Sequence, residues 1–381
     1  MWSVVVALPA VQADFAIDRG LASLPYTLTM IGYAAGGVMM GRFADRFGVG
    51  RPILVGAFAL GLGYIAAGLA QNIWQFILAH GMLIAFLGSS STFGPLIADT
   101  SLWFTRRRGI AVSICATGNY LAGTIWPPIV QHFIATVGWR TTHIGVGVFC
   151  ILTIVPLTLA LRRRPPLQHA PGAAAGPGLI IRRFAGLSPN IVQGMLVVAG
   201  LGCCIAMAMP QVHIVAYCGD LGYGVARGAE MLSLMLAFGM VSRLGSGLIA
   251  DRIGGLPTLL VGSLLQMTTL AMYLVMDGLT SLYVISILFG LVQGGIIPSY
   301  AIVIREYFPA REAGARFGVV LMATLFGMAL GGWMSGAIFD ATGSYRAAFA
   351  NGVGWNLLNA GIALFLFARR TRLPGGQLLA T

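Results

Sequence analysis

Long apolar runs separated by short polar segments dominate this chain. No charged residue interrupts residues 20–41, 52–98, 109–139, 141–161, 184–219, 253–276, 278–304, 317–339 and 347–368. A helix needs about 20 apolar residues to cross a bilayer. The runs are continuous and lack the alternation of a lipid-facing β-strand, so we expect spanning helices. The pattern therefore predicts an all-α, polytopic membrane protein.

The runs divide into twelve predicted spans, in two sets of six. They lie near residues 1–13, 21–42, 52–71, 74–98, 109–136, 140–161, 190–217, 228–250, 257–276, 280–304, 314–338 and 347–368. The first span is short. Pro9 has eight residues before it, whereas Pro210, in the similar string of the second half, follows about 18 apolar or neutral residues. We therefore expect that helix 1 is truncated at its N-terminus, with a short re-entrant segment as the alternative.

One motif occurs twice. The string GRFADRFG begins at Gly41, and GLIADRIG begins 206 residues later at Gly247. Trp139-Arg140 and Tyr345-Arg346 recur at the same interval. A repeat of half a chain in so apolar a sequence indicates a duplicated membrane bundle. We expect an N-terminal six-helix half at 1–161, a central loop at 162–187 and a C-terminal six-helix half at 188–381.

The charges are few and distributed asymmetrically. Only 9% of residues are charged, 57% are hydrophobic, and all 23 basic residues are arginine. With the predicted spans, one side of the membrane carries all of these except Arg243, which lies within a span, and Arg19, Arg140, Arg227 and Arg346. Positive loops stay cytoplasmic, so both termini should be cytoplasmic, and the lysine-free composition suggests a bacterial cytoplasmic membrane. The net charge of +12 then requires no nucleic-acid partner.

No catalytic or cofactor motif is present in the sequence. The five cysteines show no C-x-x-C spacing, the histidines lack metal-ligand spacing, and there is no Walker loop for ATP. We therefore expect no enzyme activity, no cofactor and no metal site.

Two six-helix halves, a central cytoplasmic loop and the motif G-x-x-A-D-R-x-G after the second and eighth spans resemble the major facilitator superfamily. The resemblance covers essentially the whole chain. It implies secondary transport by alternating access around a site near the bilayer midplane. It also implies that the repeated motif latches the cytoplasmic side in the outward-open state. The residues matched for this latch are Gly41, Asp45, Arg46, Gly48, Gly247, Asp251, Arg252 and Gly254. The alternative is a topological anchor of the positive-inside type.

Arg243 is the strongest candidate for substrate binding. It lies seven residues before Ala250, which places it about 10 Å into the membrane at 1.5 Å per residue. A charge at that depth is costly unless it faces a partner or a cavity, so a functional role is the default hypothesis. The string from Phe238 to Asp251 resembles the eighth helix of the monocarboxylate transporter and oxalate:formate antiporter group. That resemblance implies that Arg243 binds a substrate carboxylate, for which the guanidinium fork is well suited; snorkelling or a structural pair is the alternative.

Two departures from that group matter. Gly239 stands where the monocarboxylate carriers have an aspartate, and this chain has no lysine within its spans. A single buried cation favours a monocarboxylate, carried by symport or antiport.

Further polar residues within the spans are candidates for binding substrate. His213 could also take up a coupling proton. The remaining candidates are Tyr26, Asn119, Tyr120 and Tyr300. Besides small-anion transport by a monomer, two functions stay open: export of drugs or other hydrophobic compounds, and a receptor that binds its ligand without moving it.

Overall fold

The computed structural model describes residues 2–103, 108–160 and 186–370. Its regular elements are helical: α1 (Trp2–Phe15), α2 (Arg19–Phe47), α3 (Gly50–Gly68), α4 (Ile73–Leu78), η1 (Ala79–Ser89), α5 (Ser90–Trp103), α6 (Arg108–Val137), α7 (Trp139–Ala160), α8 (Pro189–Asp220), α9 (Val225–Ile253), α10 (Gly255–Val275), α11 (Leu279–Gln293), α12 (Ile296–Tyr307), α13 (Ala310–Thr342) and α14 (Tyr345–Arg369). Nearly all of the predicted central loop lies outside the described residues.

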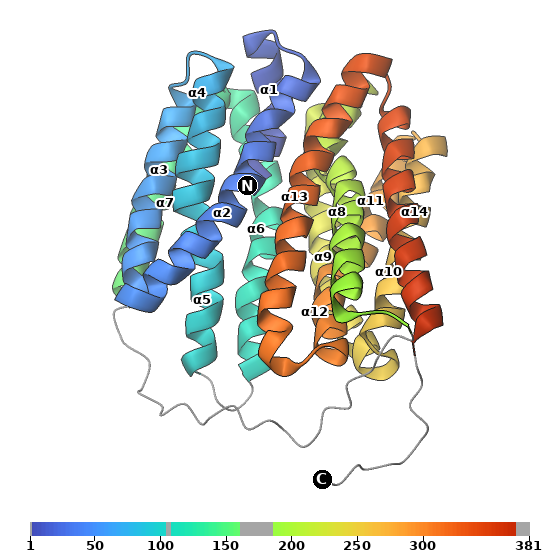
Figure 1. Ribbon diagram of the computed structural model, residues 1–381. Helices are drawn as coiled ribbons and strands as arrows, with labels where there is room; N and C mark the ends of the chain where they lie inside the picture. The colour runs from blue at the N-terminus through green and yellow to red at the C-terminus, as the bar shows by residue number, and fades with distance from the viewer. Residues whose placement is uncertain (1, 104–107, 161–185, 371–381) are drawn as a thin grey trace.

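The helices form two neighbouring groups (Figure 1). Helices α1–α7 make up one side of the bundle and α8–α14 the other, and we call them the N-half and the C-half. The halves meet where α2 packs on α13 and α6 packs on α9, with α1 against α8. The α1–α2 turn lies at the upper end in Figure 1, which we call the Arg19 end. The repeated motif lies at the lower end, the motif end.

The helices of the described residues group into twelve segments that match the twelve predicted spans in order. Nine helical stretches of the described residues are long and apolar enough to span a membrane. Helices α2 and α6 are comparably long, with 29 and 30 residues, while α1 has 14. The α4–η1–α5 stretch forms one crossing, and so do α11 and α12 together. The all-α, polytopic prediction is confirmed.

Two crossings contain irregularities that the hydropathy pattern did not predict. The fourth crossing contains a π-helical segment, η1. The tenth is divided at Gly294 and Gly295, between α11 and α12. A Cβ atom on Gly294 would lie 2.1 Å from the carbonyl oxygen of Gly239 on α9. Only glycine permits this approach, so the break brings the tenth crossing directly against the helix that carries Arg243.

The backbone repeats along with the sequence. Gly48 and Gly254, which end the two motif copies, have φ and ψ of 80° and 163° and of 91° and 163°. The amide of each donates to the carbonyl four residues earlier, on Ala44 and Ala250, at 2.8 Å. In both copies the helix therefore ends in the same sharp turn, at a glycine whose φ and ψ are essentially confined to glycine.

We predict that Gly254→Ala lowers stability because alanine is strained at this φ. The expected loss is about 1–3 kcal/mol, read as a lower Tm of the detergent-purified protein. Gly245→Ala is the matched control, since Gly245 lies within α9 and a Cβ there would meet open space. Equal Tm values for the two variants would contradict the strained turn.

Candidate functional site

Arg243 lies between the two halves. Its guanidinium carbon is 5.0 Å from the centroid of the Tyr120 ring, which α6 of the N-half supplies. Within the described parts of the chain, no carboxylate pairs with Arg243. A cation over an aromatic face gains about 0.5–2 kcal/mol, and the guanidinium keeps its hydrogen-bond donors for another acceptor. Two of the predicted site residues, Arg243 and Tyr120, are thus brought together.

Gly239 makes this pairing possible. It lies one helical turn before Arg243, and a Cβ on it would be 2.7 Å from Cε1 of Tyr120. The aromatic ring therefore fills the space in which any larger side chain at position 239 would project. Further along the same contact, one turn beyond Tyr120 on α6, the Thr124 carbonyl oxygen accepts a hydrogen bond from the Ser233 hydroxyl of α9.

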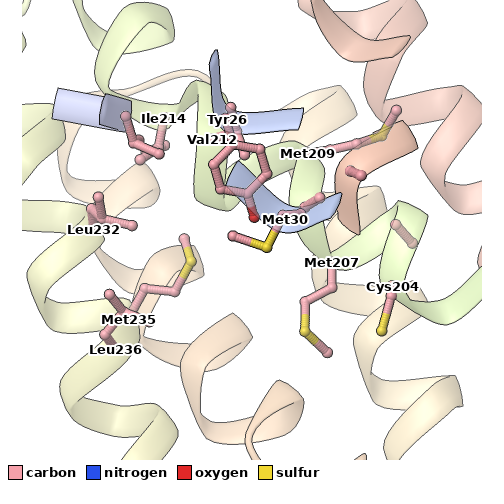
Figure 2. Packing of buried hydrophobic residues seen from close by; sticks show 14 of the residues in the cluster. Tyr26, Met30, Cys204, Met207, Met209, Val212, Ile214, Leu232, Met235 and Leu236 are labelled. Atoms are coloured by element: carbon pink, nitrogen blue, oxygen red, sulfur yellow. The ribbon is translucent and has the colours of Figure 1, made fainter. Parts of the chain in front are cut away.

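Tyr26 lies in the apolar contact between the halves. Figure 2 shows Tyr26 and Met30 of α2 among side chains of α8 and α9, including Val212 and Met235. Tyr26 is buried, and its ring packs on Gly332 of α13. Its hydroxyl has no hydrogen-bond partner in the described structure, so this group at the contact between the halves can still form a hydrogen bond.

Asn119 and Tyr300 have surroundings of their own within one half each. Asn119 lines a cavity of about 480 Å³ whose walls belong entirely to the N-half and are mostly apolar. Tyr300 is fully buried in the C-half, and its hydroxyl donates to Oδ1 of Asn359 at 2.9 Å. Asn359 in turn donates to the Ser263 hydroxyl at 2.8 Å. This hydrogen-bonded group of α10, α12 and α14 accounts for the phenol of Tyr300 without a ligand.

His213 belongs to a polar cluster at the Arg19 end. One ring nitrogen, Nε2, is 2.8 Å from the Gly332 carbonyl oxygen, and Nδ1 is 2.9 Å from the hydroxyl of Tyr345. The carbonyl can only accept, so Nε2 carries a hydrogen and Nδ1 accepts from Tyr345 in the neutral ring. Nη1 of Arg19 donates to the same hydroxyl at 3.0 Å.

Arg19 joins the halves through two carboxylates. Its guanidinium, on α2 of the N-half, forms an ion pair with Asp220 at the end of α8. The backbone amides of Arg19 and Gly20 donate to Asp340 of α13, at 2.9 and 2.6 Å. Sequence reasoning missed Arg19, Asp220, Asp340 and Tyr345. Arg19 was nevertheless one of only four arginines on the sparsely charged side, and that rarity was an available signal.

The residues of the repeated motif are mainly exposed at the motif end. The side chain of Asp45 lies outside the described residues, while Asp251, Arg46 and Arg252 are exposed. Arg46 packs over the Phe47 ring at 5.3 Å. Within the described structure a Cβ atom on Gly41 or Gly247 would meet no neighbour within 4 Å.

Comparison with known proteins establishes the family. The Major Facilitator Superfamily model matches residues 1–285 and 268–380, so the chain belongs to this superfamily. Monocarboxylate transporter 13 of Bos taurus is 27% identical over 373 residues, which cover 93% of this chain and 82% of the relative. Monocarboxylate transporter 11 of Mus musculus is 30% identical, with coverages of 80% and 70%. The MFS-type transporter opdF of Penicillium oxalicum is 27% identical, with coverages of 88% and 77%. Members of the superfamily are transporters, not enzymes.

Solved structures show the same fold. The D323A mutant of the nucleoside transporter NupG superimposes with a TM-score of 0.77 at 13% identity, covering 96% of each chain. A bacterial homologue of the human lysosomal transporter Spinster gives 0.72 at 15% identity, covering 97% of this chain and 93% of its own. At these identities the likeness concerns the fold alone.

We predict that Gly239→Ala destabilises the protein because its methyl group collides with the Tyr120 ring. Overpacking of this kind costs about 1–3 kcal/mol. In a Tyr120→Ala background the same change should cost much less, and the difference between the two backgrounds, measured by thermal unfolding, is the coupling between the positions. A coupling near zero would contradict the contact.

Proposed function

We propose that this protein is a secondary transporter for a small organic anion, a monocarboxylate above all, and that Arg243 binds the carboxylate. The observation that carries the proposal is the unpaired guanidinium of Arg243 at the contact between α6 and α9. A partly buried arginine without a carboxylate partner can offer two parallel charge-assisted hydrogen bonds to an anion. The matched monocarboxylate transporters support the choice of substrate class.

We propose alternating access as the mechanism, and the spacing of α2 and α13 supports it. Near the Arg19 end these helices touch: a Cβ on Gly336 of α13 would be 2.8 Å from the Arg19 carbonyl oxygen. Towards the motif end, Gly37 on α2 and Gly318 on α13 have no neighbour within 4 Å of an added Cβ. The close contact at the Arg19 end and the open space beside these two glycines support a pair of halves that pivots about this helix contact.

We also propose that the motif end faces the cytoplasm, because most arginines lie there. The chain would then sit in the cytoplasmic membrane with both termini inside. We further propose that it functions as a monomer and that a proton is the coupling ion.

Export of a hydrophobic compound is the second candidate function. The cavity in the N-half, with Trp126 and Phe149 among its lining residues, is the observation that favours it. Aromatic and apolar walls suit a lipophilic ligand better than a small anion.

We predict that carboxylates stabilise the purified protein through Arg243. A ligand at 100 times its Kd adds about 2.7 kcal/mol, which a thermal-shift screen of small carboxylates and neutral analogues would detect. The shift should vanish in Arg243→Leu and persist in Arg227→Leu, a matched control on the exposed start of α9. A response limited to hydrophobic cations or drugs would favour the exporter instead.

We predict counterflow in sealed proteoliposomes. Vesicles preloaded with an unlabelled carboxylate found in the screen should accumulate the labelled compound, and those with Arg243→Leu should not. A receptor would bind the compound without exchanging it, so binding without counterflow would reject transport.

A further inference from the structure

We propose that His213 is a proton-binding site that releases the closure at the Arg19 end. The inference rests on the alternating access proposed above, and it assigns a proton that gates one end of the molecule to a particular group. The cluster consists of His213, Tyr345, Arg19, Asp220 and Asp340, which we call the Arg19 cluster.

The cluster is divided unequally between the halves. Arg19 belongs to the N-half, whereas the other four residues belong to α8, α13 and α14 of the C-half. In the closed arrangement Arg19 neutralises Asp220 and its backbone contacts Asp340. Its guanidinium also lies 4.4 Å from the centroid of the Phe339 ring. The C-half thus contributes two carboxylates. The arginine that pairs with one of them, and whose backbone amide donates to the other, comes from the N-half.

Separation of the halves would remove that cation. Asp220 and Asp340 would remain together on the C-half, with Arg19 withdrawn. Adjacent carboxylates favour uptake of a proton by a neighbouring base, and His213 is the neutral base that the cluster holds. A proton on His213 would then replace, within the C-half, the positive charge that Arg19 supplies when the halves touch.

The closed arrangement disfavours the same proton. Tyr345 donates to Nδ1 of His213 and accepts from Arg19. If Nδ1 gained a hydrogen, the Tyr345 oxygen would face two donors, and an imidazolium would stand one hydroxyl away from the guanidinium of Arg19. The charged and titratable groups that surround His213 are Asp220 on α8, Arg19 on α2, Asp340 on α13 and Tyr345 on α14. Tyr217 of α8 packs on the other side of the contact, against the Tyr345 ring.

Linkage gives the direction of the effect. His213 binds a proton more tightly when Arg19 has withdrawn, so proton binding must favour withdrawal of Arg19 by the same factor. Acid therefore opens the Arg19 end, and loss of the proton lets Arg19 return and close it. A proton therefore occupies His213 while this end is open and is absent while Arg19 holds it closed.

The experiment measures the separation of the halves without any substrate. Spin labels on cysteines introduced at Gln71 and Thr280, both exposed at the Arg19 end, report this distance by double electron–electron resonance. The five native cysteines are first replaced by alanine. From pH 8 to pH 5 the distribution should gain a longer component, with a population ratio that changes by up to about tenfold per pH unit, the limit for one proton.

Variants assign the response to His213. His213→Gln should abolish the pH dependence, and His132→Gln, an exposed histidine on α6, should retain it. Tyr345→Phe removes the donor to His213 and an acceptor for Arg19, so its transition should move to higher pH. An unchanging wild-type distribution, a pH response that survives in His213→Gln, or an unshifted transition in Tyr345→Phe would overturn the proposal.

The result is independent of the substrate. If the pH-dependent distance is present but no carboxylate stabilises the protein, Arg243 loses its proposed role and the proton site stands. If carboxylates bind through Arg243 while the distance between the labels does not change with pH, the proton site is rejected and the proposed role of Arg243 stands.

Discussion

The ion pair of Arg19 with Asp220 is the interaction on which the closed end of this molecule depends. Arg19 is only 8% exposed, and a buried charge without a partner costs several kcal/mol. Asp220 and Tyr345 accept hydrogen bonds from its guanidinium. Asp340 accepts hydrogen bonds from the first backbone amides of α2. The start of α2 is therefore fixed by the C-half, although most of α2 belongs to the packing of the N-half. Movement of the halves must break this set of contacts together.

Glycine contacts explain why such movement would occur between rigid bodies. Within the C-half, a Cβ on Gly331 of α13 would lie 2.4 Å from the Ile205 carbonyl oxygen of α8. Within the N-half, Gly32 of α2 approaches the carbonyl oxygen of Gly81 equally closely. Backbones packed at this distance interlock and leave little freedom within each half. The contact between α2 and α13 also includes the hydrogen bond from the Thr27 hydroxyl to the Ala329 carbonyl oxygen. Opening of this contact would therefore break that bond together with the ion pair of Arg19.

The sequence predicted the helices because lipid imposes one requirement on every span: an apolar run of sufficient length. It also identified Arg243 and Tyr120, since charged and aromatic residues stand out in such runs. It did not predict that their side chains meet, because this depends on the rotation of α6 against α9. It also depends on Gly239, where the missing side chain leaves room for the Tyr120 ring. Tyr300 illustrates the converse: its polarity marked it as a candidate, yet a hydrogen bond to Asn359 accounts for it.

The Arg19 cluster lies where the internal repeat is broken. Asp14 and Arg140 pair within the N-half, between α1 and α7. Their counterparts 206 residues later are Asp220 and Arg346, which do not pair with each other, because Arg346 contacts Asp277.

The counterpart of Arg19 at this interval is Val225, the first residue of α9, which carries no charge. Asp220 is thus free to receive an arginine from the other half. Two identical halves would each satisfy their own charges and have no electrostatic reason to attract one another at this end. Loss of symmetry at a few positions is what joins the halves here, and it leaves His213, the group that we propose binds a proton, in the C-half.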